Sequence, residues 1–218
     1  MALILPGNVA SATAATGYDV DNSCRFDNPA DGDSASDYLT RTFDSAGNQK
    51  TFTISYWVKR WGLQTGTSWQ QVIGQQASNY FRCGFNSNEQ GDIIRMYGRF
   101  FEFRTTPFYR DVSAWYHVCL ALDTTQAVAG NRAKLYVNGT QVTSFVTESY
   151  PDQDVDLDWN MAQPHVIGRG VDGNDGLPAY LAQFVSIDGT AYAASDFGEF
   201  DEDSPTIWKP KDVSGLTF

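Results

Sequence analysis

The sequence predicts an all-β fold, an antiparallel β-sandwich, within a single domain of 218 residues. Apolar and polar residues alternate with period two over many short segments, which is the pattern of strands with one buried face. Glycine and asparagine residues interrupt this alternation about every 8 to 12 positions. Helical periodicity is absent over any useful window, and no repeat or linker divides the chain. Many short strands joined by turn residues are typical of a sandwich or barrel.

The first half of the chain carries five predicted strands. The clearest, Thr51–Arg60, alternates apolar residues with a polar face that also holds Trp57, so we expect a half-buried antiparallel strand. Because Trp57 points away from the apolar face, it either covers a second layer or lies in an interface. The other four strands are expected at Trp69–Gln75, Asn79–Asn86, Asp92–Tyr97 and Phe100–Thr105.

The second half continues the same pattern. Trp115–Asp123 alternates clearly, and Tyr180–Asp188 is the last long strand. Between them, Arg132–Val137 and Thr140–Phe145 are joined by Asn138-Gly139, which predicts a type I′ hairpin because both central residues must take a positive φ. A helical turn is expected only near Ala193–Phe197.

Composition excludes several classes of protein. The chain has 15 Lys+Arg against 26 Asp+Glu, a formal net charge of −11, which argues against a nucleic-acid partner because phosphate binding needs clustered basic residues. No apolar run approaches the ~20 residues of a bilayer-spanning helix, which argues against membrane insertion. The three cysteines are widely spaced without a C-x-x-C pair, so we expect reduced thiols and neither a disulfide framework nor a zinc site.

Residues 1–20 are predicted to form an N-terminal arm. Its first six residues lack the basic and long apolar regions of a secretory signal, and residues 7–17 are small and polar. A frayed terminus and an arm that docks on a neighbouring subunit both fit this composition. The apolar tip Leu3, Ile4 and Leu5 favours docking, because a free tail gains nothing by exposing it.

The segment Trp115-Tyr116-His117-Val118, followed by Leu135-Tyr136-Val137-Asn138-Gly139, resembles the core of concanavalin A-like, laminin-G-like jelly rolls. Ile167-Gly168-Arg169 and the strand Tyr180–Ile187 resemble the closing strands of that family. The resemblance implies a lectin-like jelly-roll domain at residues 21–190. Residues 191–218 then form a C-terminal extension that packs on the sandwich or leads to a partner.

A narrower resemblance concerns laminin-G-like proteins of tailed bacteriophages. The segments that carry it are Gly17–Phe26, Asp37–Thr42, Thr51–Arg60, Ser195–Glu199 and Trp208–Lys211. It implies a non-enzymatic virion structural protein, such as a tail fibre, head fibre or capsid decoration, made in the host cytoplasm. The arm would attach it to other virion proteins, and we expect a homo-oligomer, a trimer. Those relatives often continue past the last segment, so whether the native chain extends beyond Phe218 stays open.

Catalysis is the less favoured alternative. Glucanases of this fold use a Glu-x-Asp-x-Glu type cluster on one strand, whose alternate side chains enter one cleft. The nearest match is Glu199-Phe200-Asp201-Glu202-Asp203, which lies after the last predicted strand and is interpreted as a solvated acidic loop. No G-x-S-x-G nucleophile elbow is present, and His117 belongs to the structural signature. We therefore expect no enzyme.

Calcium is the one cofactor that the sequence pattern allows, although none is required. Asp154 and Asp156 lie in an alternating acidic run, as at the start of an EF-hand loop. An EF-hand is excluded because, counted from Asp154, the sixth position is Trp159 rather than glycine and the twelfth is His165 rather than glutamate. Asp172 and Asp175 lie in a glycine-flanked loop where carbonyl groups can converge. The alternative is an acidic surface that keeps the protein in solution.

Carbohydrate binding would need exposed aromatic rings beside Asn, Asp or Gln, because a sugar packs its C–H face on a ring while its hydroxyls hydrogen-bond. The candidates are Trp61, Trp69, Tyr109 and Trp159, and the expected ligand is a host surface glycan. Each of these side chains also fits a simple packing role in a chain with 14% aromatic residues. The sequence leaves the glycan specificity open.

Overall fold

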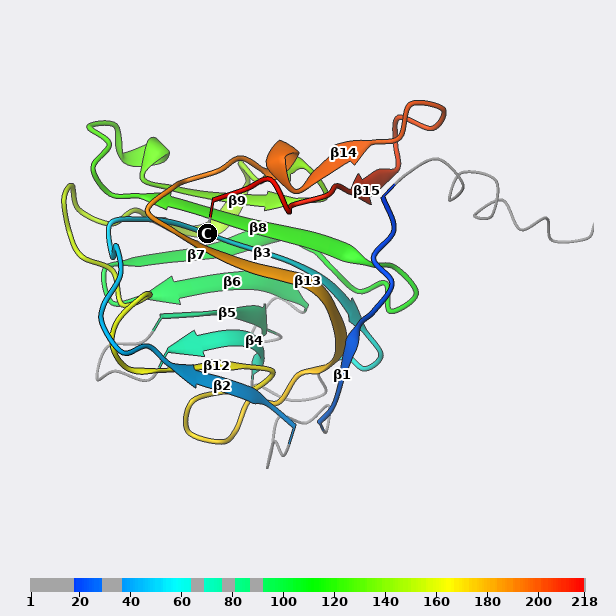
Figure 1. Ribbon diagram of the computed structural model, residues 1–218, viewed down its shortest axis with the longest axis horizontal. Helices are drawn as coiled ribbons and strands as arrows, with labels where there is room; N and C mark the ends of the chain where they lie inside the picture. Colours follow the sequence, from blue (N-terminus) through cyan, green and yellow to red (C-terminus); the bar gives the residue numbers. More distant parts are fainter. Residues whose placement is uncertain (1–17, 29–36, 64–68, 76–80, 87–91, 218) are drawn as a thin grey trace, which may run out of the picture.

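The computed structural model describes residues 18–28, 37–63, 69–75, 81–86 and 92–217. It confirms the all-β fold: two antiparallel sheets pack face to face, and a third, two-stranded sheet lies outside them (Figure 1). The only helices among the described residues are the short 3₁₀ turns η1 (Ala129–Asn131) and η2 (Ala194–Asp196). Neither is long and apolar enough to cross a membrane.

The first sheet has six strands and the second has seven. The order in the first is β1 (Cys24–Asp27), β13 (Pro178–Asp188), β3 (Thr51–Arg60), β8 (Tyr116–Asp123), β9 (Ala133–Val137) and β10 (Thr140–Gln141). The order in the second is β11 (Phe145–Ser149), β7 (Phe101–Phe108), β6 (Ile93–Gly98), β5 (Phe81–Asn86), β4 (Trp69–Gln75), β12 (Pro164–Ile167) and β2 (Leu39–Thr42). The small sheet pairs β14 (Gly198–Phe200) with β15 (Trp208–Pro210).

The core lies between the two large sheets. The apolar face of β3 enters it as the alternation predicts, and its side chains are at most 1% exposed: Phe52, Ile54, Tyr56 and Val58. Aromatic rings from the second sheet meet that face, with the ring of Phe81 5.8 Å from that of Phe52 and 5.4 Å from that of Trp159. Burial of such rings away from water is the main stabilising contribution of this core.

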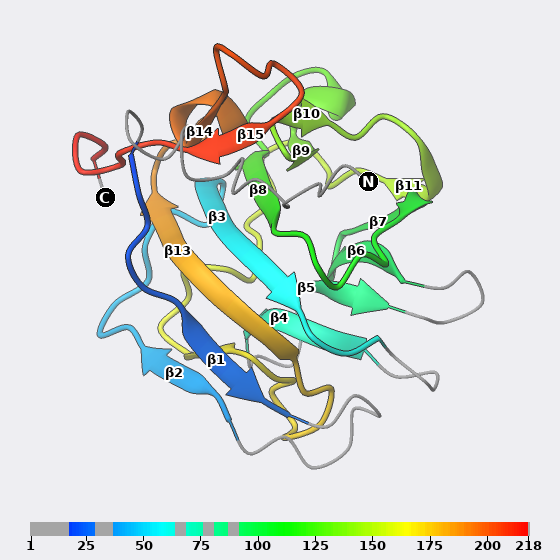
Figure 2. The same ribbon diagram turned by 90° about the vertical axis from the view of Figure 1, so that its right-hand side faces the viewer.

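The outer face of the first sheet is also covered, which corrects the prediction that β3 is half-buried. Trp57 is 8% exposed and Ser55 1%. Residues beyond β13 lie over this face, where Phe197 is buried and Trp208 packs against the same cluster. Figures 1 and 2 show β14 and β15 on the outside of the sheet. Trp57 therefore faces a second layer, one of the two alternatives that its position left open.

Most predicted strands are confirmed to within two residues, and the hairpin at Asn138-Gly139 is confirmed by φ values of 48° and 76°. The predicted strand Thr140–Phe145 is wrong. The chain pairs in the first sheet only to Gln141, and Phe145 already pairs with β7 in the second. The acidic segment is also not a simple loop, because Glu199 lies in β14 and Asp201 is buried beside Lys209.

Most of the predicted N-terminal arm lies outside the residues that the structure describes. Leu3, Ile4 and Leu5 lie outside the described residues. The three cysteines are free thiols, with Cys24 exposed and Cys83 and Cys119 buried. The division of the chain at residues 20 and 190 stays a prediction.

Candidate functional site

A cleft opens where the two large sheets end on the same side. β1 pairs with only the first four residues of β13, from Pro178 to Leu181, so the second half of β13 has no strand beside it on that edge within the described residues (Figure 2). Opposite it, β2 forms the edge of the second sheet. The space between these two edges is a cleft of about 500 Å³.

Aromatic rings form much of the cleft wall. Phe43, Trp159, His165 and Phe184 all line it. The ring of His165 lies 4.6 Å from that of Phe43 and 4.6 Å from that of Trp159. Phe184 is stacked on Tyr56 of the core at 6.1 Å. The rings are therefore held in place by packing rather than left free on the surface.

Polar groups converge on the same space. Asp188 Oδ1 accepts hydrogen bonds from the backbone N–H of Asn48 at 2.7 Å and from Asn160 Nδ2 at 3.1 Å. The indole N–H of Trp159 donates to Ser186 Oγ at 3.1 Å. On the opposite wall the guanidinium group of Arg41 lies 5.3 Å from the centre of the Phe43 ring. No carboxylate of a described residue forms an ion pair with Arg41.

His165 presents a buried acceptor without a donor. The residue is 5% exposed, and its Nδ1 lies 2.8 Å from the carbonyl oxygen of Gln163. Because a carbonyl oxygen only accepts, Nδ1 carries the proton and Nε2 carries a lone pair. Burial lowers the pKa of the imidazole, an effect that the backbone groups of Gln163 and Arg41 partly oppose, and it keeps the ring neutral at pH 7. Nε2 has no hydrogen-bond partner among the described residues, a condition that costs about 1–3 kcal/mol and is relieved by a ligand that donates.

The predicted carbohydrate-binding residues do not form one exposed surface. Trp159 lines the cleft but is 2% exposed, and Trp69 and Tyr109 are 7% and 8% exposed. Trp69 is covered by Arg82 and Arg95, whose guanidinium groups lie 5.1 and 4.6 Å from its ring. Only Trp61 is exposed, and its indole N–H donates to the carbonyl oxygen of Phe26. The expectation of exposed rings is therefore wrong for three of the four, because neighbouring side chains cover them.

The four predicted calcium ligands do not form one group, although Asp172 and Asp175 lie close together around Gly170. Asp154 and Asp156 are exposed. Asp172 accepts a hydrogen bond from the backbone of Asn174, and Asp175 accepts one from the backbone of Trp69. The described part of the chain contains no group of three or more His, Cys, Asp or Glu residues that could hold a metal ion. These four carboxylates thus do not form one calcium site among the described residues, and calcium as an optional cofactor stays a prediction.

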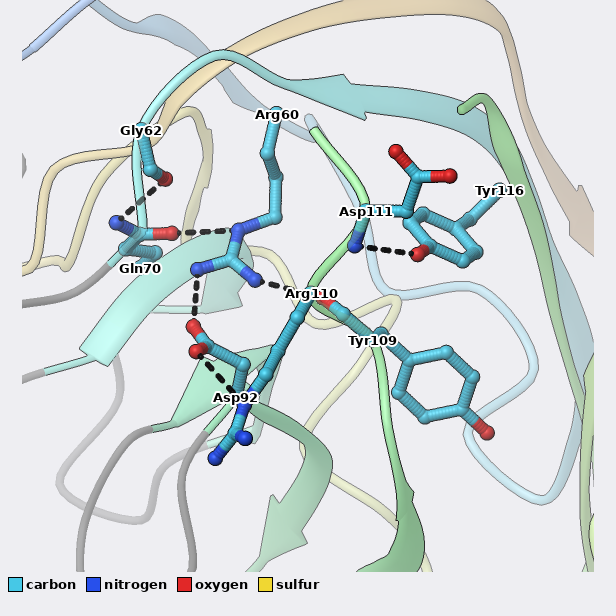
Figure 3. Close-up of polar contacts among 8 residues, drawn as sticks. All are labelled: Arg60, Gly62, Gln70, Asp92, Tyr109, Arg110, Asp111 and Tyr116. Atoms are coloured by element: carbon cyan, nitrogen blue, oxygen red, sulfur yellow. Dashed lines mark hydrogen bonds and ion pairs between the residues drawn. The ribbon is translucent and has the colours of Figure 1, made fainter. Parts of the chain in front are cut away.

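A second polar cluster, at one end of the sandwich, was not predicted from the sequence. Arg60 is 1% exposed and donates to Gln70 Oε1 at 2.8 Å, to the carbonyl oxygen of Tyr109 at 2.9 Å and to Asp92 Oδ1 at 2.5 Å (Figure 3). Its guanidinium group also lies 4.3 Å from the Phe85 ring. Since all three guanidinium nitrogens have partners, this cluster joins the two sheets and fits a structural role.

Comparisons with known proteins agree on the fold. A sequence model described as the concanavalin A-like lectin/glucanases superfamily matches residues 32–191. No curated protein matches the chain. Among solved structures, a heptameric SAP-like pentraxin from Limulus polyphemus has a TM-score of 0.52 at 13% identity, over 78% of this chain and 77% of the pentraxin.

Two further structures are similar to this chain. Mouse laminin α1 chain domains LG4-5 have a TM-score of 0.50 at 11% identity, over 80% of this chain and 44% of that one. Domain 4 of AbnA, an extracellular arabinanase from Geobacillus stearothermophilus solved with arabinotriose, has a TM-score of 0.46 at 12% identity, over 78% and 84%. At such identities the likenesses to the pentraxin and to the laminin domains show a common fold and nothing about ligands.

Proposed function

Because the chain belongs to the concanavalin A-like lectin/glucanase superfamily, we propose that it is a non-enzymatic carbohydrate-binding protein whose site is the cleft between β2 and β13. The observation that carries this proposal is the unpaired Nε2 of His165, a buried acceptor in a cleft lined by aromatic rings. Ligand sites typically combine apolar walls with a few such convergent polar groups.

A saccharide can supply the hydrogen-bond donor that His165 Nε2 lacks. Its C–H faces can pack on Phe43 and Phe184, while a hydroxyl group donates to His165 Nε2. The carboxylate of Asp188 offers a further acceptor, and Arg41 offers donors at the opposite wall. An apolar ligand would leave the histidine lone pair buried without a donor, at the cost already described.

Binding without hydrolysis is favoured by the acidic groups of the cleft. Glycoside hydrolysis generally needs two carboxyl groups, about 5–5.5 Å apart in retaining enzymes and about 6.5–9.5 Å apart in inverting ones. Asp188 is the single carboxylate among the described residues that line the cleft. It is already held by Asn48 and Asn160. These observations support a binding role over a catalytic one.

Filling the cleft tests this proposal. Ala46 is exposed at the cleft rim, so Ala46→Trp is expected to obstruct the cleft without disturbing the core. We expect the full chain to bind a glycan on an array, and its dissociation constant, measured by titration calorimetry, to rise at least tenfold in this variant.

Ala127→Trp is the matched control, because Ala127 is equally exposed but does not line the cleft. It should bind the glycan as the unmodified chain does. A chain that binds no glycan, or an Ala46→Trp variant with unchanged affinity, would contradict the proposal.

We propose that this protein is a structural component of a virion. What supports it is the resemblance to laminin-G-like proteins of tailed bacteriophages, carried by the segments Gly17–Phe26, Asp37–Thr42, Thr51–Arg60, Ser195–Glu199 and Trp208–Lys211. In this role the jelly roll supplies a rigid body, the arm attaches it to other virion proteins, and the assembled form is a homotrimer. Host surface glycans would be the ligands of the cleft.

Purified particles give the test of the virion role. We expect mass spectrometry to detect the chain in them, at high copy number for a capsid decoration and at low copy number for a fibre. Light scattering of the isolated chain should give the mass of a trimer. Absence from particles together with a monomeric mass would overturn the structural role while leaving glycan binding to be judged by the cleft variants.

A further inference from the structure

Three tryptophans surround a second pocket, on the outer face of the first sheet. Trp57 comes from β3, Trp115 precedes β8, and Trp208 comes from β15. The pocket has a volume of about 400 Å³, and residues 20–23 form its remaining wall together with Ala182, Lys209 and Pro210. It is separate from the cleft, since the two share no lining residue.

The indole N–H of Trp57 lacks an acceptor. Trp57 is 8% exposed, and its Nε1 is buried without a hydrogen-bond partner in the part of the chain that the structure describes. Other tryptophans of the protein are satisfied: Trp208 donates to His117 Nδ1, and Trp61 donates to the carbonyl oxygen of Phe26. A buried tryptophan N–H usually finds a partner, so the exception at a pocket wall points to an acceptor supplied by a ligand.

The polar groups at the pocket rim indicate which hydrogen-bonding groups a ligand would need. Asp21 and Asn22 are exposed, and the carboxylate of Asp21 has no hydrogen bond or ion pair with a described residue. Lys209 is already paired, with Nζ 3.6 Å from Glu199 Oε1 and 3.4 Å from Asp201 Oδ2. The pocket therefore offers a free acceptor in Asp21, a donor in Trp57 and no uncommitted positive charge among its described residues.

We propose that this three-tryptophan pocket binds the acetamido group of an N-acetylated sugar. The acetamido carbonyl accepts from the Trp57 N–H, its N–H or a neighbouring hydroxyl donates to Asp21, and its methyl group packs against the indole rings. An organic cation would also favour the rings and Asp21, but it would leave the Trp57 N–H without an acceptor. The proposal extends the proposed carbohydrate-binding function to a second site with a narrower preference.

Saturation-transfer NMR and tryptophan fluorescence on the full chain test this preference with N-acetylglucosamine and glucose as probes. We expect N-acetylglucosamine to quench fluorescence, with the strongest transfer at its methyl group, and glucose to bind at least tenfold more weakly. Trp57→Phe keeps an aromatic ring but removes the N–H, and should weaken N-acetylglucosamine binding about fivefold. Asp21→Asn, at an exposed position where a substitution is expected to change stability little, should weaken it about tenfold.

The matched controls are Trp61→Phe, which removes a satisfied indole N–H elsewhere, and Asp19→Asn, an exposed neighbour that does not line the pocket. Both should bind N-acetylglucosamine with unchanged affinity. Equal binding of the two sugars, no binding of either, or unchanged affinity in Asp21→Asn would overturn the proposal. Loss of N-acetylglucosamine binding in Ala46→Trp, with Trp57→Phe unaffected, would assign that sugar to the cleft, so the two sites are distinguished.

Discussion

Replacing Asp92 by alanine is expected to lower the free energy of unfolding by about 3–5 kcal/mol, because it leaves the Arg60 guanidinium buried without its counter-charge. Arg60 is 1% exposed, and burial already lowers its pKa, with Asp92 opposing that effect. The two residues tie β3 of one sheet to the start of β6 in the other (Figure 3). Urea unfolding of both proteins at pH 7 measures the difference.

Two further variants separate the charge from the packing at this position. Asp92→Asn keeps an acceptor for Arg60 without the charge, and should lose less stability than Asp92→Ala. Arg110 also approaches Asp92, at 3.6 Å, but its side chain is 54% exposed, so Arg110→Ala should cost less than about 1 kcal/mol. An Asp92→Ala variant that loses under about 1 kcal/mol would contradict a structural role for the buried pair.

Acidification from pH 7 to pH 4 is expected to remove about 3 kcal/mol of stability through His117 alone. Burial lowers the pKa of this imidazole from 6.5 to about 4. As the pH falls below 6.5 the unfolded chain binds the proton while the folded chain does not, so stability is lost until about pH 4. The geometry agrees, since Trp208 donates to Nδ1 at 3.1 Å and the remaining proton on Nε2 reaches Ser55 Oγ at 2.8 Å.

Comparison with His117→Gln isolates this contribution, because glutamine keeps hydrogen-bonding atoms but does not titrate. The unmodified chain should lose about 3 kcal/mol more than the variant between pH 7 and pH 4, measured by urea unfolding at several pH values. The other titrating groups, including His165 and the buried Asp158 and Asp175, are present in both proteins and cancel in the difference. Parallel pH profiles for the two proteins would show that His117 is not the group responsible.

The sequence by itself determined the long strands. In β3 and β8 successive side chains point to opposite faces of the sheet, so the period-two alternation predicted which of them enter the core. The turn at Asn138-Gly139 was equally predictable, because a positive φ is a local requirement of two adjacent residues. Short edge strands such as β2, with all four residues exposed, carry no such alternation and were not predicted.

Only the tertiary structure showed which residues come together in the cleft and in the tryptophan pocket. Phe43, His165 and Phe184 come from three distant segments, and they form a cleft because β1 stops halfway along β13. The same holds for the tryptophan pocket, whose walls depend on residues 191–217 folding back over the first sheet. The pattern within one strand indicates to which face of the sheet a side chain points. Whether that side chain is exposed depends on whether distant segments of the chain pack over that face. For that reason Trp69 and Tyr109 were taken for exposed rings and are buried, while the unpaired N–H of Trp57 and lone pair of His165 became visible only in three dimensions.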